Sequence, residues 1–130
     1  MRQNIVPLCD ALLAEGFTVQ IETNGTLLQP VPPAVHIVCS PKNAGRGYSP
    51  LRDDVLERAQ ALKFIVSHRD PLYRGVPDVG QSRYGTPVYV QPMDEYDPEA
   101  NAANRAHAAQ LAQEFGYILS LQTHKILGIE

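Results

Sequence analysis

The chain alternates between short strand-like segments and stretches with helical spacing, and this alternation constrains its fold more than any other feature. Alternating or continuous apolar residues predict strands at 17–21, 35–39, 62–66, 88–90 and 117–122. Apolar residues at helical spacing predict helices within 4–16, 49–59 and 97–115. Strands that alternate with helices form a mostly parallel sheet with right-handed crossovers. The predicted class is therefore α/β, in a single domain that spans residues 1–130.

The predicted helices begin and end with residue types that favour helix termini. Asn4 is suited to cap the first helix and Gly16 to end it. Ser49 and Asp97 each precede a proline, which is the typical form of a helix start. The apolar face of the first helix is expected to consist of Ile5, Leu8, Leu12 and Leu13.

The stretch 67–85 has no sustained hydrophobic period. Glycine, proline and arginine are scattered through it. It is expected to be an irregular surface loop or an insertion specific to a family, and no function follows from it.

Composition excludes several classes of protein. Hydrophobic residues make up 44% of the chain and charged residues 19%, which is ordinary for a soluble globular protein. No apolar run approaches the roughly 18 residues that a membrane span needs, and the N-terminus lacks the apolar core of a signal peptide, so we expect a cytoplasmic protein. The net charge is −3 and the basic residues are scattered, which argues against nucleic acid as a partner.

The cysteines and histidines do not predict a metal site. Cys9 and Cys39 lie thirty residues apart and match no close-spaced ligand pattern, so both are expected to be small buried hydrophobic residues. The four histidines are dispersed and form no ligand pair at helical spacing. There is also no G-x-S-x-G elbow and no glycine-rich phosphate loop.

Polar clusters follow the strands at 22–24, 40–42, 91–94 and 122–125. In a parallel sheet these strand ends lie along one edge, where small molecules bind. The Glu22 carboxylate is suited to accept hydrogen bonds from ribose hydroxyls or from an amino-heterocycle. Lys42 is suited to bind a small-molecule carboxylate. Met93 could pack on a purine ring, although core packing is the commoner role of such a residue. The alternative interpretation is that strand ends are loops and loops are simply polar.

The last eight residues hold a histidine, a lysine and the chain's final carboxylate after a strand-like segment. Such an end is either part of a site or a strand that frays into a soluble tail. From the residues alone, the prediction is a small-molecule site of unspecified chemistry on an α/β sheet.

Four groups of residues, at 21–26, at 39–42, at 62–66 with 91–93, and at 119–125 with 127–129, together resemble the 7-carboxy-7-deazaguanine synthase family of the radical S-adenosylmethionine superfamily. The resemblance implies a lyase that converts 6-carboxy-5,6,7,8-tetrahydropterin to 7-carboxy-7-deazaguanine with loss of ammonia, in queuosine biosynthesis. It implies a 4Fe-4S cluster, S-adenosylmethionine and magnesium (Mg2+) as cofactors. It also implies an incomplete parallel β/α barrel that usually forms a homodimer.

The resemblance assigns roles to specific residues of this chain. The implied S-adenosylmethionine site consists of Ser40, Pro41, Lys42, Gln91, Pro92, Met93 and Asp94, with Glu22 and Asn24 facing the same region. The implied substrate ligands are Gln122, His124 and Glu130, the last through its α-carboxylate.

The chain departs from the family pattern because the family's cluster-binding cysteines, its magnesium-ligating threonine and its Gly-Gly-Glu-Pro segment would all lie before Met1. We therefore expect the C-terminal part of the family barrel, with no catalytic residue and no metal ligand of its own. The strand at 17–21 is expected to have an unpaired edge. The chain alone is expected to be inactive. The alternatives are a non-catalytic binding or assembly module, which pairs with a chain that supplies the cluster half, and a degenerate remnant.

Overall fold

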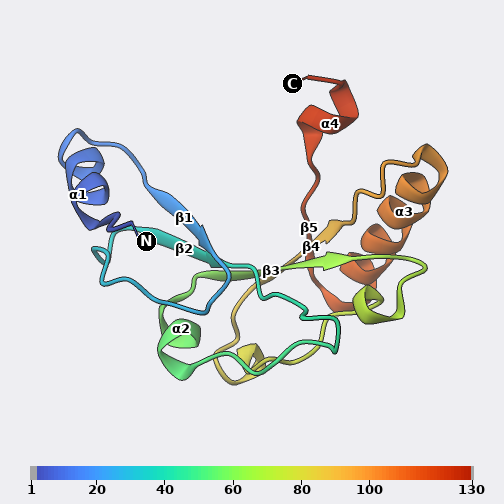
Figure 1. Cartoon of the computed structure of the whole chain (residues 1–130), viewed down its shortest axis with the longest axis horizontal. Coiled ribbons are helices and arrows are strands. Elements are labelled where there is room, and N and C mark those ends of the chain that lie inside the picture. The colour runs from blue at the N-terminus through green and yellow to red at the C-terminus, as the bar shows by residue number, and fades with distance from the viewer. Residues whose placement is uncertain (1–2, 130) are drawn as a thin grey trace.

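A computed structural model describes residues 3–129, and within them five strands form one parallel sheet (Figure 1). The strands are β1 Gln20–Thr23, β2 His36–Cys39, β3 Ala61–Val66, β4 Val88–Pro92 and β5 Ile118–Leu119. They follow one another across the sheet in sequence order, so each new strand is added on the same side. The predicted α/β class with a mostly parallel sheet is confirmed.

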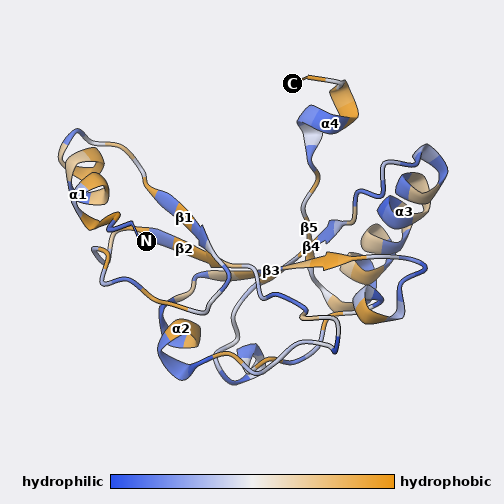
Figure 2. Cartoon of the chain, in the orientation of Figure 1, coloured by the Kyte–Doolittle hydropathy of each residue, from blue (hydrophilic) through white to orange (hydrophobic). Residues whose placement is uncertain are grey.

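Helices α1 Val6–Ala14, α2 Asp53–Arg58 and α3 Pro98–Phe115 pack on one face of this sheet. One core cluster joins Leu62, Phe64 and Val90 of the strands to Leu56 of α2 and Leu111 of α3. A second cluster joins Cys9 of α1 to valines and an isoleucine of the first two strands and their connections. Figure 2 shows the matching change of hydropathy, from a hydrophilic β1 at the edge to a hydrophobic β3 at the centre. The apolar face of the sheet is therefore the helix-covered face.

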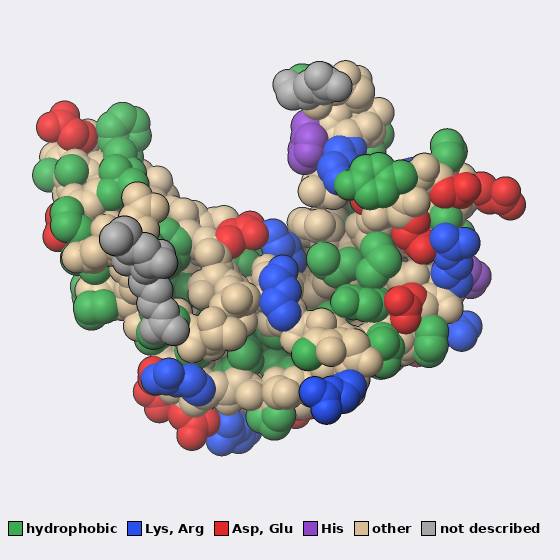
Figure 3. All heavy atoms as spheres, in the orientation of Figure 1, with side chains coloured by type: hydrophobic (Ala, Val, Ile, Leu, Met, Phe, Trp, Pro, Cys, Tyr) green, Lys and Arg blue, Asp and Glu red, His purple; other side chains and the backbone are tan. Residues whose placement is uncertain are grey.

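The opposite face of the sheet carries a mixture of polar and apolar side chains. Side chains alternate between the two faces of a strand, and the positions that alternate with the core residues line two cavities. These positions are Gln20, Glu22, His36, Val38, Ala61, Lys63, Ile65, Tyr89, Gln91, Ile118 and Ser120. Parallel sheets are usually covered on both faces. Figure 3 shows the molecule hollowed between its α1 and α4 ends, above this uncovered face.

The first helix and strand differ from their predicted bounds. Leu8, expected on the apolar face of α1, is 59% exposed, and Cys9 is buried in its place. The side chain of Asn4 does accept a hydrogen bond from the backbone N–H of Val6, at 3.1 Å. Phe17 was expected to begin the strand, but its N–H bonds the carbonyl of Leu12 at 3.0 Å. Phe17 therefore belongs to the turn that ends α1, and β1 starts three residues later.

The second helix begins at Asp53 rather than at Ser49. Arg52 has extended backbone angles, and the N–H of Leu51 donates to the carbonyl of Val79 at 2.9 Å. The long connection 67–85 therefore holds this segment extended. That connection is irregular as predicted, with short 3-10 turns at Pro71–Tyr73 and Gln81–Arg83. It is not wholly a surface loop, because Ser67, Val79 and Gln81 are buried.

The third helix and the chain end complete the fold. Asp97 caps α3 as predicted, since its carboxylate accepts from the N–H of Ala100 at 2.7 Å, and Gly116 ends the helix with a φ of 72°. The last strand was expected to reach residue 122, but it ends at Leu119. A short helix, α4 Thr123–Leu127, follows, because the carbonyl of Gln122 accepts from the N–H groups of two later residues.

Candidate functional site

A cavity of about 600 Å³ lies at the carboxyl ends of the strands. Seven of the residues predicted for the site contribute to its lining: Glu22, Asn24, Ser40, Pro41, Lys42, Gln91 and Gln122. They come from β1 and the segment after it, from the segment that follows β2, from β4, and from the segment before α4. The parallel sheet thus places along one wall groups that are up to a hundred residues apart in the sequence.

Ser40 is held at the end of β2 and has an unused hydroxyl group. Its backbone N–H donates to the carbonyl of Thr23 at 2.6 Å, which continues the ladder between β1 and β2. Its Oγ is buried and has no hydrogen-bond partner among the described residues. Buried hydroxyls are nearly always paired, which makes this oxygen a candidate for a hydrogen bond to a ligand.

An ion pair that the sequence did not predict crosses the same sheet face. The Nζ of Lys63 donates to both carboxylate oxygens of Glu22 at 2.7 Å. The Lys63 side chain is 19% exposed and that of Glu22 is 52% exposed. Lys63 lies on the central strand β3 and Glu22 on the edge strand β1, so the pair spans β2. The signal in the sequence was a lysine at an alternate position of an otherwise apolar strand.

Two tyrosine rings form another part of the cavity lining. The rings of Tyr48 and Tyr73 meet edge to face with centroids 6.3 Å apart, and Tyr48 packs in the same way on Phe64 at 5.4 Å. Burial, and to a lesser extent the neighbouring Tyr73, raises the pKa of Tyr48 to about 12, so its hydroxyl stays protonated. Asn43 ties the two loops together, because its Nδ2 donates to the carbonyl of Leu72 at 2.9 Å. The sequence analysis missed these tyrosines, which lie in irregular loops.

The predicted run from Gln91 to Asp94 is divided between two places. Gln91 lines the large cavity, while Pro92, Met93 and Asp94 line a separate pocket of about 90 Å³ beside α4. Asp94 is engaged within the chain: its carboxylate accepts from the Nζ of Lys125 at 2.6 Å and from the Nδ2 of Asn101 at 2.9 Å. The hydrogen bond from Lys125 is the main reason that the pKa of Asp94 falls to about 2. Asp94 therefore fixes α4 to the end of β4.

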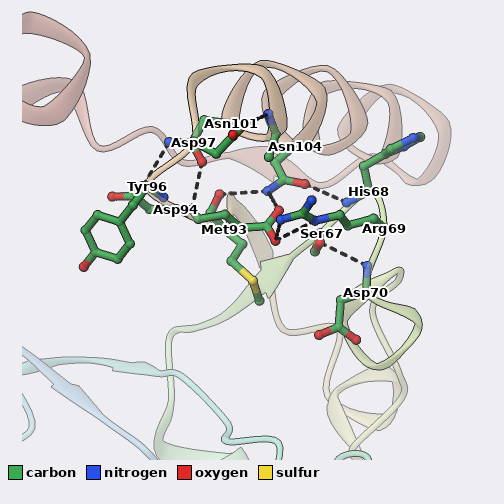
Figure 4. A network of polar contacts seen from close by, with 12 residues as sticks. Ser67, His68, Arg69, Asp70, Met93, Asp94, Tyr96, Asp97, Asn101 and Asn104 are labelled. Carbon is green, nitrogen blue, oxygen red and sulfur yellow. Dashed lines mark hydrogen bonds and ion pairs between the residues drawn. The ribbon is translucent and has the colours of Figure 1, made fainter.

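A buried asparagine holds the segments that follow β3 and β4 (Figure 4). Asn104 of α3 is 1% exposed. Its Oδ1 accepts from the N–H of His68 at 2.8 Å. Its Nδ2 donates to the carbonyl of Met93 at 3.0 Å and to the carboxylate of Glu95 at 2.8 Å. One side chain thus fixes the backbone beyond two neighbouring strands.

The predicted substrate ligands have different positions. Gln122 lines both the large cavity and the small pocket. His124 is exposed on α4 and is absent from the described lining of either. Glu130 lies outside the described residues, so the role of its α-carboxylate stays a prediction.

The two cysteines lie in the apolar core and are absent from the described lining of the large cavity. Cys9 and Cys39 are both buried, each in a different core cluster on the helix-covered face. Burial raises the pKa of the Cys39 thiol to about 11. Over residues 3–129, no three or more histidine, cysteine or acidic side chains gather where they could hold a metal ion. None of the helices in the same range is long and apolar enough to cross a membrane.

Fold and cavity together define a parallel α/β protein whose strand ends line a cavity of the size that small molecules occupy. No family model matches the chain. It is 52% identical to the 7-carboxy-7-deazaguanine synthase of Rickettsia prowazekii, over 100% of this chain and 56% of that protein. It is 38% identical to the 7-carboxy-7-deazaguanine synthase of Rhodospirillum rubrum, over 99% of this chain and 61% of that protein. The crystal structure of QueE from Escherichia coli matches with a TM-score of 0.62 and 26% identity, over 92% of this chain and 51% of that one.

The chain is a relative of the 7-carboxy-7-deazaguanine synthases and spans about half the length of the curated relatives that it matches. This partial coverage agrees with the expected correspondence to the C-terminal part of the family.

Proposed function

We propose that the chain forms the part of a 7-carboxy-7-deazaguanine synthase that binds S-adenosylmethionine and the pterin substrate. The reaction of the whole enzyme would convert 6-carboxy-5,6,7,8-tetrahydropterin to 7-carboxy-7-deazaguanine with loss of ammonia. The observation that carries the proposal is the cavity that collects Glu22, Ser40, Lys42, Gln91 and Gln122 at the carboxyl ends of the strands. We expect the complete enzyme to be a cytoplasmic homodimer.

The chemistry of the cavity lining suits S-adenosylmethionine. This molecule presents ribose hydroxyls, a carboxylate and an adenine ring. The unpaired Oγ of Ser40 can bond a ribose hydroxyl, and the exposed Lys42 carries the charge that a carboxylate needs. These groups support the assignment of Ser40 and Lys42 to the cofactor.

The residues of this chain do not fit the 4Fe-4S cluster that the family uses. The cluster, where present, supplies the electron that cleaves S-adenosylmethionine. The two cysteines of this chain are buried in separate apolar clusters on the helix-covered face, whereas the cavity residues of the strands project from the other face. We therefore propose that the chain alone binds S-adenosylmethionine without cleaving it.

Titration of S-adenosylmethionine into the 130-residue chain by isothermal titration calorimetry tests the proposal. We expect saturable binding that weakens about two- to tenfold in Ser40→Ala, the effect of one neutral hydrogen bond. Ser49→Ala is the matched control, because Ser49 is exposed and outside the described lining of the cavity. No binding to the wild-type chain would refute the proposal.

A second candidate is a non-catalytic binding module that pairs with a separate cluster-bearing chain. The uncovered sheet face favours it, because a face with both polar and apolar side chains is suited to bind a ligand without further chemistry. Co-expression with a cluster-bearing partner tests this candidate. Iron content together with S-adenosylmethionine cleavage by the pair would support the module, whereas no cleavage would leave the degenerate remnant.

A further inference from the structure

Lys63 occupies a distinctive position on the uncovered sheet face. It lies on the central strand β3, with two strands on either side. It lines the large cavity at the carboxyl ends of the strands and also a second cavity, of about 340 Å³, that extends over the same face toward their amino ends. A cation at this point can reach a ligand in either cavity.

The partner of Lys63 is more exposed than Lys63 itself. The Glu22 side chain is 52% exposed on the edge strand, whereas the Lys63 side chain is 19% exposed. An ion pair with one well-solvated member contributes little to stability, so the carboxylate of Glu22 can leave at small cost. Loss of the counter-ion is costly for a lysine whose side chain is mostly buried, so another carboxylate would have to replace that of Glu22.

The remaining described groups around Lys63 cannot serve as that replacement. In addition to the pair itself, the second cavity is lined by His36, by neutral polar side chains and by apolar side chains such as Val38 and Ile118. Glu22 is the carboxylate that lines both cavities with Lys63. A ligand carboxylate would therefore compete with Glu22 alone among the described acidic residues that line these cavities.

We propose that Lys63 binds the carboxylate of a small-molecule ligand and that Glu22 is its exchangeable counter-ion. In the ligand-free chain Glu22 accepts both hydrogen bonds of Lys63. On binding, the ligand carboxylate takes these bonds, and the displaced Glu22 is free to accept from ligand N–H or O–H groups. This inference rests on the proposed function. The carboxylate belongs to the pterin substrate where Lys42 binds that of S-adenosylmethionine, and to S-adenosylmethionine where Lys63 takes the place of Lys42.

The two sources are separated by measuring each ligand with and without its carboxylate. Calorimetry would compare 6-carboxypterin with pterin, and S-adenosylmethionine with decarboxylated S-adenosylmethionine, on the wild-type chain. The readout is the ratio of affinities within each pair. We expect a ratio of about ten in one pair, as one charge-assisted interaction gives. The pair that shows it identifies the source.

Two variants are expected to change that ratio in opposite directions. Lys63→Met removes the cation, so the ratio should fall to about one. Glu22→Gln removes the competing charge and keeps Lys63, so the ratio should rise severalfold. Arg83→Met is the matched control, because it also removes one positive charge but from an exposed ion pair with Asp53, outside the described lining of both cavities.

The outcomes distinguish this inference from the proposed function. A merely structural ion pair predicts that both variants lower the melting temperature and leave the ratio unchanged, and that result would overturn the inference. The inference would also fail if Glu22→Gln lowered the ratio. Binding of none of the four ligands to the wild-type chain would refute both proposals. If Lys63→Met unfolds, the rise expected for Glu22→Gln still decides the matter.

Discussion

Replacing Asn104 by alanine should destabilise the chain strongly, although the substituted position is in the middle of a helix. The side chain makes three hydrogen bonds, to the N–H of His68, the carbonyl of Met93 and the carboxylate of Glu95. Alanine makes none of them, and it leaves a backbone donor and a backbone acceptor without their partner in a partly buried setting. Loss of these bonds would release the segments that follow β3 and β4 (Figure 4).

The size of the effect follows from the three bonds. The two neutral bonds are worth about 1 kcal/mol each, and the bond to the carboxylate about 1.5–3 kcal/mol. Alanine favours helix over asparagine and returns roughly 0.6 kcal/mol. We expect a net loss of about 3 kcal/mol in the free energy of unfolding. For a chain of this size that corresponds to a fall of roughly 10 °C in melting temperature.

Urea unfolding followed by circular dichroism measures this loss, with an unchanged m-value as evidence that the same transition is observed. Gln113→Ala, an exposed substitution on the same helix, is the control and should stay within about 0.5 kcal/mol. Asn104 is also the first cause of the lowered pKa of Glu95, so the pKa of Glu95 should rise in the variant. A loss below about 1 kcal/mol with the pKa of Glu95 unchanged would refute the reasoning.

Three further predictions concern the site and its supports. Gly25→Ala should cost about 1–3 kcal/mol by urea unfolding, because Gly25 has a φ of 79° and a Cβ would lie 2.8 Å from the Sγ of Cys39; a neutral result would contradict this. Ser40→Ala should leave the melting temperature within about 2 °C, because its Oγ has no described partner to lose; a large fall would reveal an overlooked bond. The contact of Lys125 with Asp94 should persist above about pH 4 and be lost as pH falls through about 2. The pKa of Asp94 is lower in the folded chain than its unfolded value of 3.8, so the ion pair stabilises the fold above about pH 4 and this stabilisation is lost as the pH falls. NMR titration of the α4 amides should show this transition in the wild-type chain and not in Asp94→Asn.

The sheet could be predicted from the sequence because its signals are local. The apolar run of β3 and the cap and stop residues of α3 act within a few neighbouring residues. The bounds that failed depend on distant contacts. α2 begins late because Leu51 bonds Val79, and β5 ends early because the chain turns into α4, which Asp94 holds through Lys125. Such contacts join residues 28 and 31 positions apart, and periodicity does not report them.

The candidate site was predictable where it follows from topology. Parallel strands bring their carboxyl ends to one edge, and this rule is sufficient to place Glu22, Ser40 and Gln91 in one cavity. The rule does not say which polar residue is already satisfied within the chain. Asp94 appeared equivalent to Gln91 in sequence, yet its carboxylate is occupied by Lys125 and Asn101. Only the geometry separates a residue that supports the site from one that is available to a ligand.

The alternation of residues in β3 also predicts which face of the sheet carries Lys63. In β3 the residues Leu62, Phe64 and Val66 point to the helix-covered core, so the alternate position 63 must lie on the other face. A lysine there is unfavourable if helices cover both faces, as they do in most parallel sheets. Its presence in a central strand therefore already implies that the second face meets solvent, a ligand or a charged partner. Gln20, His36 and Gln91 have the same parity in their own strands. Polar residues of the first four strands thus share the uncovered face with apolar ones, and the lysine at its centre is the basis of the proposed carboxylate site.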